Sequence, residues 1–223
     1  MKKLPTVFER VYAGHKVVDI RPEFTSPDAM YALRHGTATV KVDGSCCAIF
    51  NGVFYKRYDA KKGKKVPDGA IPCCDADPVT GHHPCWVKID PSNPSDKWFL
   101  EARKNYPERW IVDGTYEAVG PHFNGNPYRL ERDSLIRHGV QTVFEVERTF
   151  EGVRQFLTEH LIEGLAFWVG DEPVCKIKRT DFGLPWPVEL EGSLDTLLTR
   201  LCADPLGYLG EAQEICPIAE VQK

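Results

Sequence analysis

Residues 37–58, TATVKVDGSCCAIFNGVFYKRY, contain three short segments rich in β-branched and aromatic side chains. Such a composition, with side chains that alternate in character, is typical of strands. Asp-Gly at 43–44 and Asn-Gly at 51–52 separate the segments, and both dipeptides are strong signals for tight turns. The stretch therefore predicts an antiparallel meander of three strands. Lys41 lies at the end of the first strand, just before the first turn.

The rest of the chain predicts more strands than helices. Four further segments are rich in β-branched and aromatic residues and are bounded by turn residues: 109–119, 141–147, 164–169 and 173–179. The turn signal GDEP at 170–173 would join the last two as a hairpin. Three segments predict helices: 95–106 with Ser95 as N-cap, 151–161, and 193–202 with Ser193 as N-cap. The sequence thus predicts an α+β fold, with a domain over 1–190 that contains twisted antiparallel sheets and a short helical extension over 191–223 that packs on it.

Composition limits the classes of function. The 223 residues are 42% hydrophobic and 27% charged, which provides enough apolar material for a proper core. The formal net charge is only -4, so a polyanionic partner would have to contact a local basic strip rather than a globally positive surface. The N-terminal segment lacks the apolar centre of a signal peptide, and no stretch has the length of apolar sequence that spans a membrane. We therefore expect a cytoplasmic protein with no membrane partner.

Two predicted loops, 59–94 and 120–134, are too long to be simple connections, and loops of this length tend to be functional. The first contains a cluster of possible zinc ligands: Cys73, Cys74, His82, His83 and Cys85. Because the cluster lacks the CxxC spacing of common zinc sites, we favour a substrate-facing flap over structural zinc. We expect the eight cysteines of the chain to be reduced, because four of them form vicinal pairs, which seldom form disulfides.

Charged side chains at the ends of the predicted strands indicate a site for phosphoryl chemistry. Lys176 and Lys178 would lie on one face of their strand, because side chains in a strand alternate with period two. Two adjacent cations lower the pKa of a neighbouring lysine and also bind phosphate, so Lys41 is a candidate covalent nucleophile. Glu117 and Glu163 are suited to bind Mg²⁺ or ribose hydroxyls.

Six segments follow one another along the chain: KVDG at 41–44, YKRYD around Arg57, TYEAVG at 115–120, TVFEVE at 142–147, EGLAF at 163–167 and KIK at 176–178. In this order they resemble the six nucleotidyltransferase motifs of the ATP-dependent ligases and mRNA capping enzymes. The longer strings KVDGSCC, YKRYDAKKGKK, GAIPC, DPVTGH and HFNGNPY resemble more specifically the small 5′-to-3′ RNA ligase family typified by the vertebrate enzyme. The resemblance extends over most of the chain, up to the start of the predicted C-terminal extension.

The resemblance implies a nucleotidyltransferase fold, an ATP-grasp-like ligase adenylation domain with twisted antiparallel sheets that flank a nucleotide cleft. We expect no OB-fold, because too few residues follow KIKRTDFGLPW to form a five-stranded barrel. The implied reaction has three steps and uses ATP and Mg²⁺ (or Mn²⁺). Lys41 takes AMP from ATP, the AMP passes to an RNA 5′-phosphate, and an RNA 3′-hydroxyl displaces it. The implied partner is RNA with 5′-phosphate and 3′-hydroxyl ends, as in RNA repair, and we expect a monomer.

The resemblance also assigns roles to single residues. Lys41 is the catalytic residue, and Asp43 and Gly44 shape the turn behind it and belong to the ATP site. The other expected residues of the ATP site are Val40, Arg57, Glu117, Phe144, Glu163, Lys176 and Lys178. The expected metal ligands are Glu117 and Glu163. The expected RNA contacts are Arg57, Lys61, Lys62, Lys64 and His122.

Each of these roles has a structural alternative. Phe144 either stacks on adenine or belongs to the core. Lys176 and Lys178 either contact the α-phosphate or form the solvated face of an edge strand. The basic run at 61–65 either contacts RNA or is solvated, and His122 either contacts RNA or only orders its loop. Two alternatives for the whole protein are another covalent nucleotidyltransferase, such as a DNA ligase or a GTP-using capping enzyme, and a non-catalytic RNA-binding relative.

Overall fold

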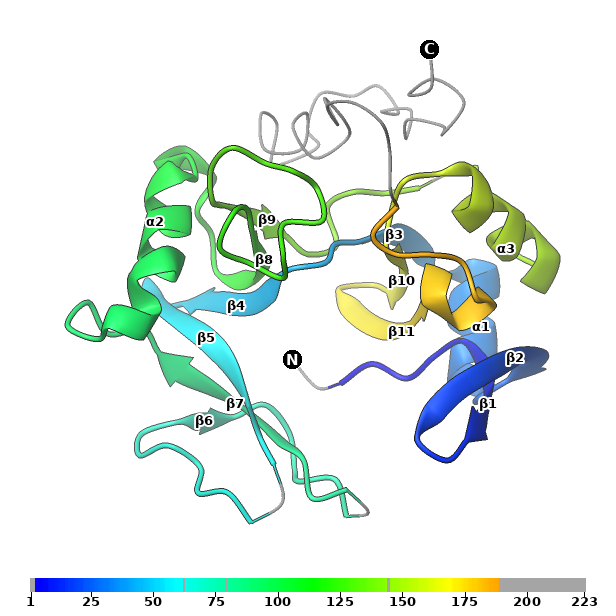
Figure 1. The fold of residues 1–223 in the computed structure, drawn as a ribbon, viewed down its shortest axis with the longest axis horizontal. Coiled ribbons are helices and arrows are strands. Elements are labelled where there is room, and N and C mark those ends of the chain that lie inside the picture. Colours follow the sequence, from blue (N-terminus) through cyan, green and yellow to red (C-terminus); the bar gives the residue numbers. More distant parts are fainter. Residues whose placement is uncertain (1–2, 62, 79, 144, 189–223) are drawn as a thin grey trace. The chain divides into compact units, whose positions relative to one another are not determined.

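The computed structural model describes residues 3–61, 63–78, 80–143 and 145–188, and its fold is α+β with antiparallel sheets (Figure 1). The chain divides into two compact units. Of the described residues, unit 1 contains Lys3 and those within 43–138, and unit 2 contains 4–42 and those within 139–188. No helix in the described ranges is long and apolar enough to cross a membrane.

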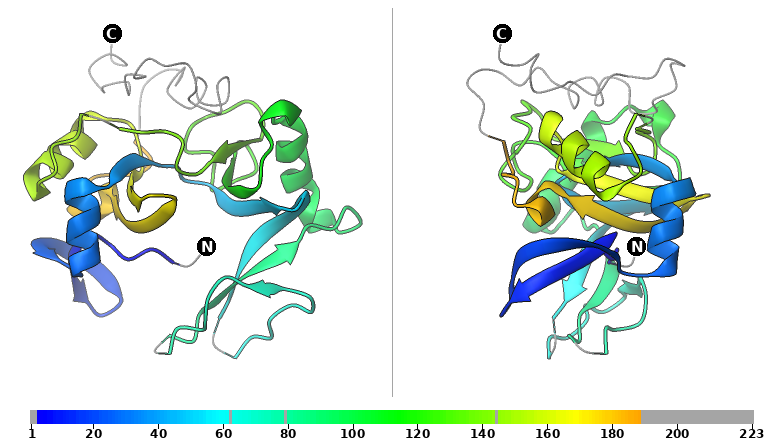
Figure 2. Two further views of the ribbon diagram at one scale, coloured as in Figure 1. Left: turned by 180° about the vertical axis from the view of Figure 1, so that it is seen from behind. Right: turned by 90° about the vertical axis from the view of Figure 1, so that its right-hand side faces the viewer.

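Unit 1 is built on a six-stranded antiparallel sheet in the order β6-β7-β5-β4-β8-β9. Its strands are β4 (Ser45–Phe50), β5 (Val53–Ala60), β6 (Ile71–Pro72), β7 (His83–Lys88), β8 (Gly114–Val119) and β9 (Ser134–Arg137). Figure 2 shows the twist of the long β5 and β7 ribbon. The hairpin predicted at Asn51-Gly52 is confirmed between β4 and β5, where these residues have the positive φ angles, 50° and 73°, of a type I′ turn. Helix α2 (Lys97–Asn105) packs on β8 and β9 between the 3₁₀ helices η1 (Pro94–Asp96) and η2 (Glu108–Trp110).

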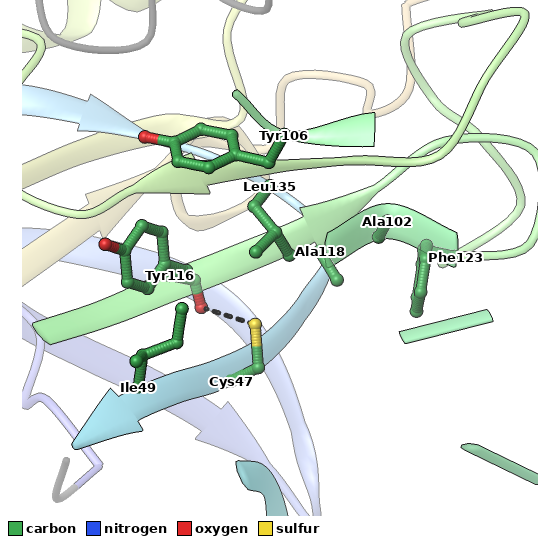
Figure 3. Close-up of a cluster of buried hydrophobic side chains, with 8 residues drawn as sticks. All are labelled: Cys47, Ile49, Ala102, Tyr106, Tyr116, Ala118, Phe123 and Leu135. Atoms are coloured by element: carbon green, nitrogen blue, oxygen red, sulfur yellow. Dashed lines mark hydrogen bonds between the residues drawn. The ribbon is translucent and has the colours of Figure 1, made fainter. Parts of the chain in front are cut away.

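One face of this sheet forms the core of unit 1 (Figure 3). Alternate positions of β4, β8 and β9 contribute to this core, as do one residue within α2, one just after α2 and one in the loop after β8. The members of the cluster are Cys47, Ile49, Ala102, Tyr106, Tyr116, Ala118, Phe123 and Leu135. The rings of Tyr106 and Tyr116 meet edge to face with centroids 5.7 Å apart. Because side chains alternate along a strand, Cys46 and Glu117 point to the opposite face of the sheet.

Unit 2 is built on a three-stranded antiparallel sheet in the order β11-β10-β3. Its strands are β3 (Thr37–Lys41), β10 (Gly164–Val169) and β11 (Glu172–Lys178), and the predicted hairpin between the last two is confirmed. Residues 5–7 extend the β11 edge through backbone hydrogen bonds with Lys176. Residues 141–143 extend the β3 edge, where the backbone N–H of Val40 donates to the carbonyl oxygen of Gln141.

The other elements of unit 2 are the hairpin of β1 (Phe8–Ala13) and β2 (Lys16–Phe24), the helices α1 (Pro27–His35) and α3 (Phe150–Glu159), and the 3₁₀ helix η3 (Arg179–Phe182). Ser26 caps α1 by accepting a hydrogen bond from the N–H of Ala29 at 3.1 Å. Helix α1 packs on one face of the sheet, where the thiol of Cys175 lies 3.9 Å from the carbonyl oxygen of Ala29. Lys176 and Lys178 therefore lie on the face that α1 does not cover.

The predicted three-stranded meander is wrong in its first pairing. β3 pairs with β10 in unit 2, whereas β4 pairs with β5 and β8 in unit 1. Asp43-Gly44 therefore does not close a hairpin and instead begins the connection into a second sheet. A turn signal is local, and it does not determine which strand pairs with the strand before the turn.

Other predicted boundaries change as well. In the described part of 141–147, only residues 141–143 pair with β3, through a bridge between Thr142 and Thr39 and two flanking backbone hydrogen bonds, so the full strand predicted there does not form. The long loop predicted at 59–94 contains the strands β6 and β7. The strand predicted at 109–119 begins only at Gly114, because η2 precedes it. Asp96, not Ser95, is the N-cap of α2.

The helix predicted at 151–161 is confirmed as α3, which begins one residue earlier. The hairpin of β1 and β2 and the helix α1 were not predicted. The helix predicted at 193–202 and the whole extension at 191–223 lie outside the described residues. The division into a domain over 1–190 and an extension stays a prediction.

A buried carboxylate joins α2 to the sheet of unit 1, and we expect its removal to destabilise the protein. The carboxylate of Asp96, 1% exposed, pairs with the ammonium of Lys56 and accepts the N–H of Asp90 at 3.0 Å. Asp96→Ala would leave both donors without this acceptor, so we expect a loss of about 2–4 kcal/mol in the free energy of unfolding. Urea denaturation at neutral pH measures the loss.

The matched control is Asp68→Ala. Asp68 forms an exposed ion pair with Lys65 at 2.8 Å, in the same unit, and water screens this pair. We expect the urea midpoint of this variant to stay close to that of the unmodified protein. Equal destabilisation by the two substitutions would contradict the role given to Asp96.

Candidate active site

Lys41 lies in one row of residues across the sheet of unit 2. Gly164 of β10 pairs with Lys41 of β3 on one side and with Lys178 of β11 on the other. Residues that pair directly in an antiparallel sheet point to the same face, so the side chains of both lysines project from the same face of the sheet. A side chain cannot replace the glycine hydrogen, because a Cβ at Gly164 would lie 2.1 Å from the carbonyl oxygen of Ile177.

The carboxylate of Glu163 holds the two lysines of this row. Its side chain is 5% exposed, and it forms ion pairs with the ammonium of Lys41 and, at 3.2 Å, with that of Lys178. A buried carboxylate needs such partners, because the desolvation of an unpaired charge is costly. Glu163 directly precedes Gly164 in the sequence. The glycine lies between the two lysines in the sheet, and the carboxylate next to it in the chain forms the ion pairs with them.

Lys176 adds a third ammonium to this face, two residues before Lys178. Burial is the largest cause that lowers the pKa of Lys176, and together with the positive charges of Lys41 and Lys178 it brings this pKa to about 8. The carboxylate of Glu163 acts in the opposite sense but does not offset the burial. The face therefore carries three lysines around one carboxylate, which is an arrangement suited to bind phosphate.

Asp43 and Gly44 are held within unit 1. The side-chain amide of Asn124 donates to the Asp43 carboxylate at 2.9 Å and to the Gly44 carbonyl at 2.7 Å. The N–H of Asp43 donates to the hydroxyl oxygen of Tyr128 at 2.6 Å. A Cβ at Gly44 would lie 2.3 Å from the carbonyl oxygen of Ala118, so glycine allows the close approach to β8. The long loop between β8 and β9 thus fixes the connection that follows the β3 strand.

Glu117 projects from the face of the unit 1 sheet opposite the core. Cys46 pairs with it across β4 and β8, and the imidazole Nε2 of His138 lies 2.8 Å from its carboxylate. The other ring nitrogen of His138 lies 3.0 Å from the hydroxyl oxygen of Thr115. Burial raises the pKa of the Cys46 thiol well above its usual value, and the Glu117 carboxylate raises it further.

Arg57 lies on the same face of the sheet as Cys46. Tyr55 pairs with Ala48, and since side chains alternate, Arg57 and Cys46 occupy this face as well. The Arg57 guanidinium forms an ion pair with Asp59 at 3.0 Å. Polar residues thus gather on one face of the sheet, while the other face forms the core.

The ring of His122 is held by one contact to its face and another to its edge. Its ring stacks on Trp98 with centroids 3.2 Å apart, and its Nδ1 lies 2.7 Å from the buried carboxylate of Asp133. These contacts support the alternative that His122 orders its loop, and contact with RNA stays a prediction. Lys61 and Lys64 are exposed between β5 and β6, as an RNA contact requires. Lys62 and Phe144 lie outside the described residues.

The structure divides the predicted residues between the two units. It brings together Lys41, Glu163, Lys176 and Lys178 in unit 2, where Val40 also lies within β3. Unit 1 contains Asp43, Gly44, Arg57, Glu117 and His122. The cysteines and histidines of 73–85 do not gather into a metal-binding group in the described residues.

Several candidate residues were missed by sequence reasoning. His138 follows β9 with no motif around it, and only the strand pairing reveals its contact with Glu117. Tyr128 was part of a predicted loop, but its bond to Asp43 spans two distant segments. Gln141 has a buried side-chain amide without a hydrogen-bond partner among the described residues, so it is a candidate for hydrogen bonding to a ligand.

The comparisons with known proteins agree with the resemblance of the motifs. No protein-family model matches the chain. The protein named RNA ligase 1 from Rattus norvegicus is 25% identical to it, over 84% of this chain and 82% of the rat protein. RNA ligase 1 from Danio rerio is 26% identical, over 76% of this chain and 74% of its own length, and RNA ligase 1 from Mus musculus is 25% identical, over 84% and 82%. The chain is therefore similar, at about 25% identity, to proteins named RNA ligase 1, and this similarity supports a relationship to the RNA ligase family.

Proposed function

We propose that the protein is an ATP-dependent RNA ligase that joins 5′-phosphate and 3′-hydroxyl ends of RNA through a lysyl-AMP intermediate on Lys41. The observation that carries the proposal is the row of Lys41, Gly164 and Lys178, with the Glu163 carboxylate paired to both lysines. The names of the relatives give the polymer, since each is called an RNA ligase. A nucleotidyltransferase adenylation fold is part of the proposal.

In the first step, the Nζ of Lys41 attacks the α-phosphorus of ATP, a phosphoramidate bond forms, and pyrophosphate leaves. Lys41 must first lose a proton, and the Glu163 carboxylate, which contacts Nζ, is positioned to accept it. Lys176 and Lys178 supply positive charge on the same face, where they stabilise the charge on the α-phosphate.

In the second step, an oxygen of an RNA 5′-phosphate attacks the phosphorus of lysyl-AMP, and the amine of Lys41 leaves. In the third step, an RNA 3′-hydroxyl attacks the 5′-phosphate of the adenylylated RNA, a phosphodiester forms, and AMP leaves. We assign RNA contact to the basic run at 61–65, where Lys61, Lys64 and Lys65 are exposed, because such cations bind the RNA backbone, and to the partly buried Arg57. His122 is a further candidate.

The carboxylates of Glu117 and Glu163 are oxygen ligands of the kind that Mg²⁺ prefers, and their donor chemistry fits this ion. When bound, Mg²⁺ would neutralise charge on the phosphates of ATP. We assign ribose contact to Glu117 as an alternative. Gln141 could recognise adenine, because a side-chain amide can donate to one edge atom of the base and accept from its amino group.

The first prediction of the proposal is covalent labelling. The protein incubated with Mg²⁺ and ATP radiolabelled in the α-phosphate should carry the label on a denaturing gel, and its intact mass should rise by one adenylyl group. Lys41→Ala removes the nucleophile, so it should abolish the label. Lys88→Ala, which removes an exposed lysine at the end of β7, is the control and should label normally.

A chase of the labelled protein separates the alternatives. The label should move to 5′-phosphorylated RNA and not to 5′-phosphorylated DNA, and labelled GTP should not replace ATP. Labelling by GTP would favour a capping enzyme, and transfer to DNA would favour a DNA ligase. An absence of label in the unmodified protein, with either nucleotide, would overturn the proposal.

The second prediction concerns the pH dependence of ATP binding. Lys176 has a pKa of about 8, so it is charged below this pH and loses its charge as the pH rises above it. If its ammonium binds phosphate, the affinity for ATP should fall above about pH 8, by up to about tenfold per pH unit. Calorimetric titration with an α,β-methylene analogue of ATP, which cannot adenylylate the protein, measures this dependence.

Lys176→Met keeps the length of the side chain and removes the charge. This variant should bind the analogue more weakly at pH 7 and should show a smaller dependence on pH between about 8 and 9.5. If the pH dependence of the variant matched that of the unmodified protein, Lys176 would not be the group that titrates.

A further inference from the structure

Three potential metal ligands meet on the polar face of the unit 1 sheet, outside the lysine cluster of unit 2. They are the thiol of Cys46, the carboxylate of Glu117 and the imidazole of His138, and their ligand atoms all lie within 4.8 Å of one another. This is the one group of three or more such side chains in the described residues. The proposed ligase function uses Glu117 but gives no role to Cys46 or His138.

The strand register makes this group a property of the fold. Cys46 and Glu117 are a directly paired couple on β4 and β8, so their side chains point to the same face. Glu117 also pairs with Ile136 on β9, and His138 follows two residues later, which places it on the same face. The N–H of His138 donates to the carbonyl oxygen of Thr115 at 3.0 Å, which fixes the backbone at the strand end.

From these contacts we infer that Cys46, Glu117 and His138 form a binding site for a borderline transition-metal ion of the Zn²⁺ class. Thiolate, imidazole and carboxylate are the three side chains that bind Zn²⁺ in proteins, and three protein ligands leave a fourth position for water or a ligand. In a tetrahedral site with bonds of about 2.0–2.3 Å the ligand atoms lie about 3.3–3.8 Å apart. In the structure the ligand atoms lie within 4.8 Å of one another, so side-chain shifts on the order of 1 Å would be needed to reach such separations.

His138 has a tautomer that suits a metal ligand. Its Nδ1 lies 3.0 Å from the hydroxyl of Thr115, and an imidazole that binds a metal commonly uses its other nitrogen in this way. With the proton on Nδ1, Nε2 has a free lone pair, whereas in the other tautomer Nε2–H donates to the carboxylate of Glu117, which lies 2.8 Å away. A bound metal ion would take the place of the proton between Nε2 and Glu117 and would favour the first tautomer. When the ion binds, the proton of the Cys46 thiol passes to water, and the thiolate becomes the third ligand.

Titration of the purified protein with Co²⁺, in the absence of nucleotide, tests the site. The unmodified protein should show a near-ultraviolet charge-transfer band from thiolate to Co²⁺ and the visible bands of tetrahedral coordination. Competition with a chromophoric chelator then gives the Zn²⁺ affinity. Cys46→Ser should lose the charge-transfer band, and His138→Gln should weaken Zn²⁺ binding by at least about tenfold.

Cys47→Ala is the matched control, because Cys47 is adjacent in sequence but points into the core on the other face. This variant should keep the band. Absence of the band in the unmodified protein would overturn the site, as would a band that persists in Cys46→Ser and disappears in Cys73→Ser. Should Cys46→Ser fail to fold, the Zn²⁺ affinities of His138→Gln and Glu117→Gln decide, since both must fall.

One consequence rests on the proposed function. If Glu117 serves the nucleotide reaction, Zn²⁺ at this site occupies the same carboxylate, so Zn²⁺ should inhibit adenylylation less in His138→Gln than in the unmodified protein. The Co²⁺ spectrum does not depend on ATP, so the metal site and the ligase activity fail or succeed separately.

Discussion

The ion pairs of Glu163 are the interaction on which the charged face of unit 2 depends. Two ammonium groups in one row, on either side of Gly164, would repel each other without a carboxylate between them. Burying this carboxylate costs desolvation energy, and buried ion pairs are a weak source of stability compared with apolar packing. The arrangement is therefore explained better by the chemistry of the face than by the stability of the fold.

Two glycines make this chemistry geometrically possible. Gly164 and Gly44 both sit where a Cβ would come within 2.1–2.3 Å of a backbone oxygen, on β11 in one case and on β8 in the other. Neither needs a positive φ angle, so each is required by close approach and not by its own backbone conformation. Their neighbours in sequence are Glu163 and Asp43, so the close backbone contacts of the two glycines fix the positions of these two charged residues.

The sequence predicted the parts of the site that depend on local patterns. Alternation placed Lys176 and Lys178 on one face, and Asn51-Gly52 identified the β4–β5 hairpin. It did not predict that β3 and β4 belong to different sheets, because pairing with β10 depends on contacts between distant segments. The motifs predicted Glu163 as a metal ligand, which stays a prediction, and its pairing with two lysines follows only from the folded arrangement.

His138 is a second case of this limit, since no motif surrounds it and its contact with Glu117 arises from the order of β4, β8 and β9. A pattern in the sequence shows which side chains of one strand share a face. A site of this kind also depends on how three strands are aligned with one another. The vicinal cysteines show the difference clearly. Cys47 packs in the core and Cys46 joins the polar face, although the two have the same side chain and adjacent positions.

This face also separates two classes of metal ion by chemistry. A hard ion such as Mg²⁺ takes oxygen ligands and ignores a neutral thiol, so Glu117 can serve a nucleotide while Cys46 and His138 stay uninvolved. A borderline ion such as Zn²⁺ gains from the sulfur and the imidazole nitrogen and would use all three residues. The softer ligands therefore decide which ion competes for the carboxylate. An oxygen-only face would lack this discrimination, which Cys46 and His138 together introduce.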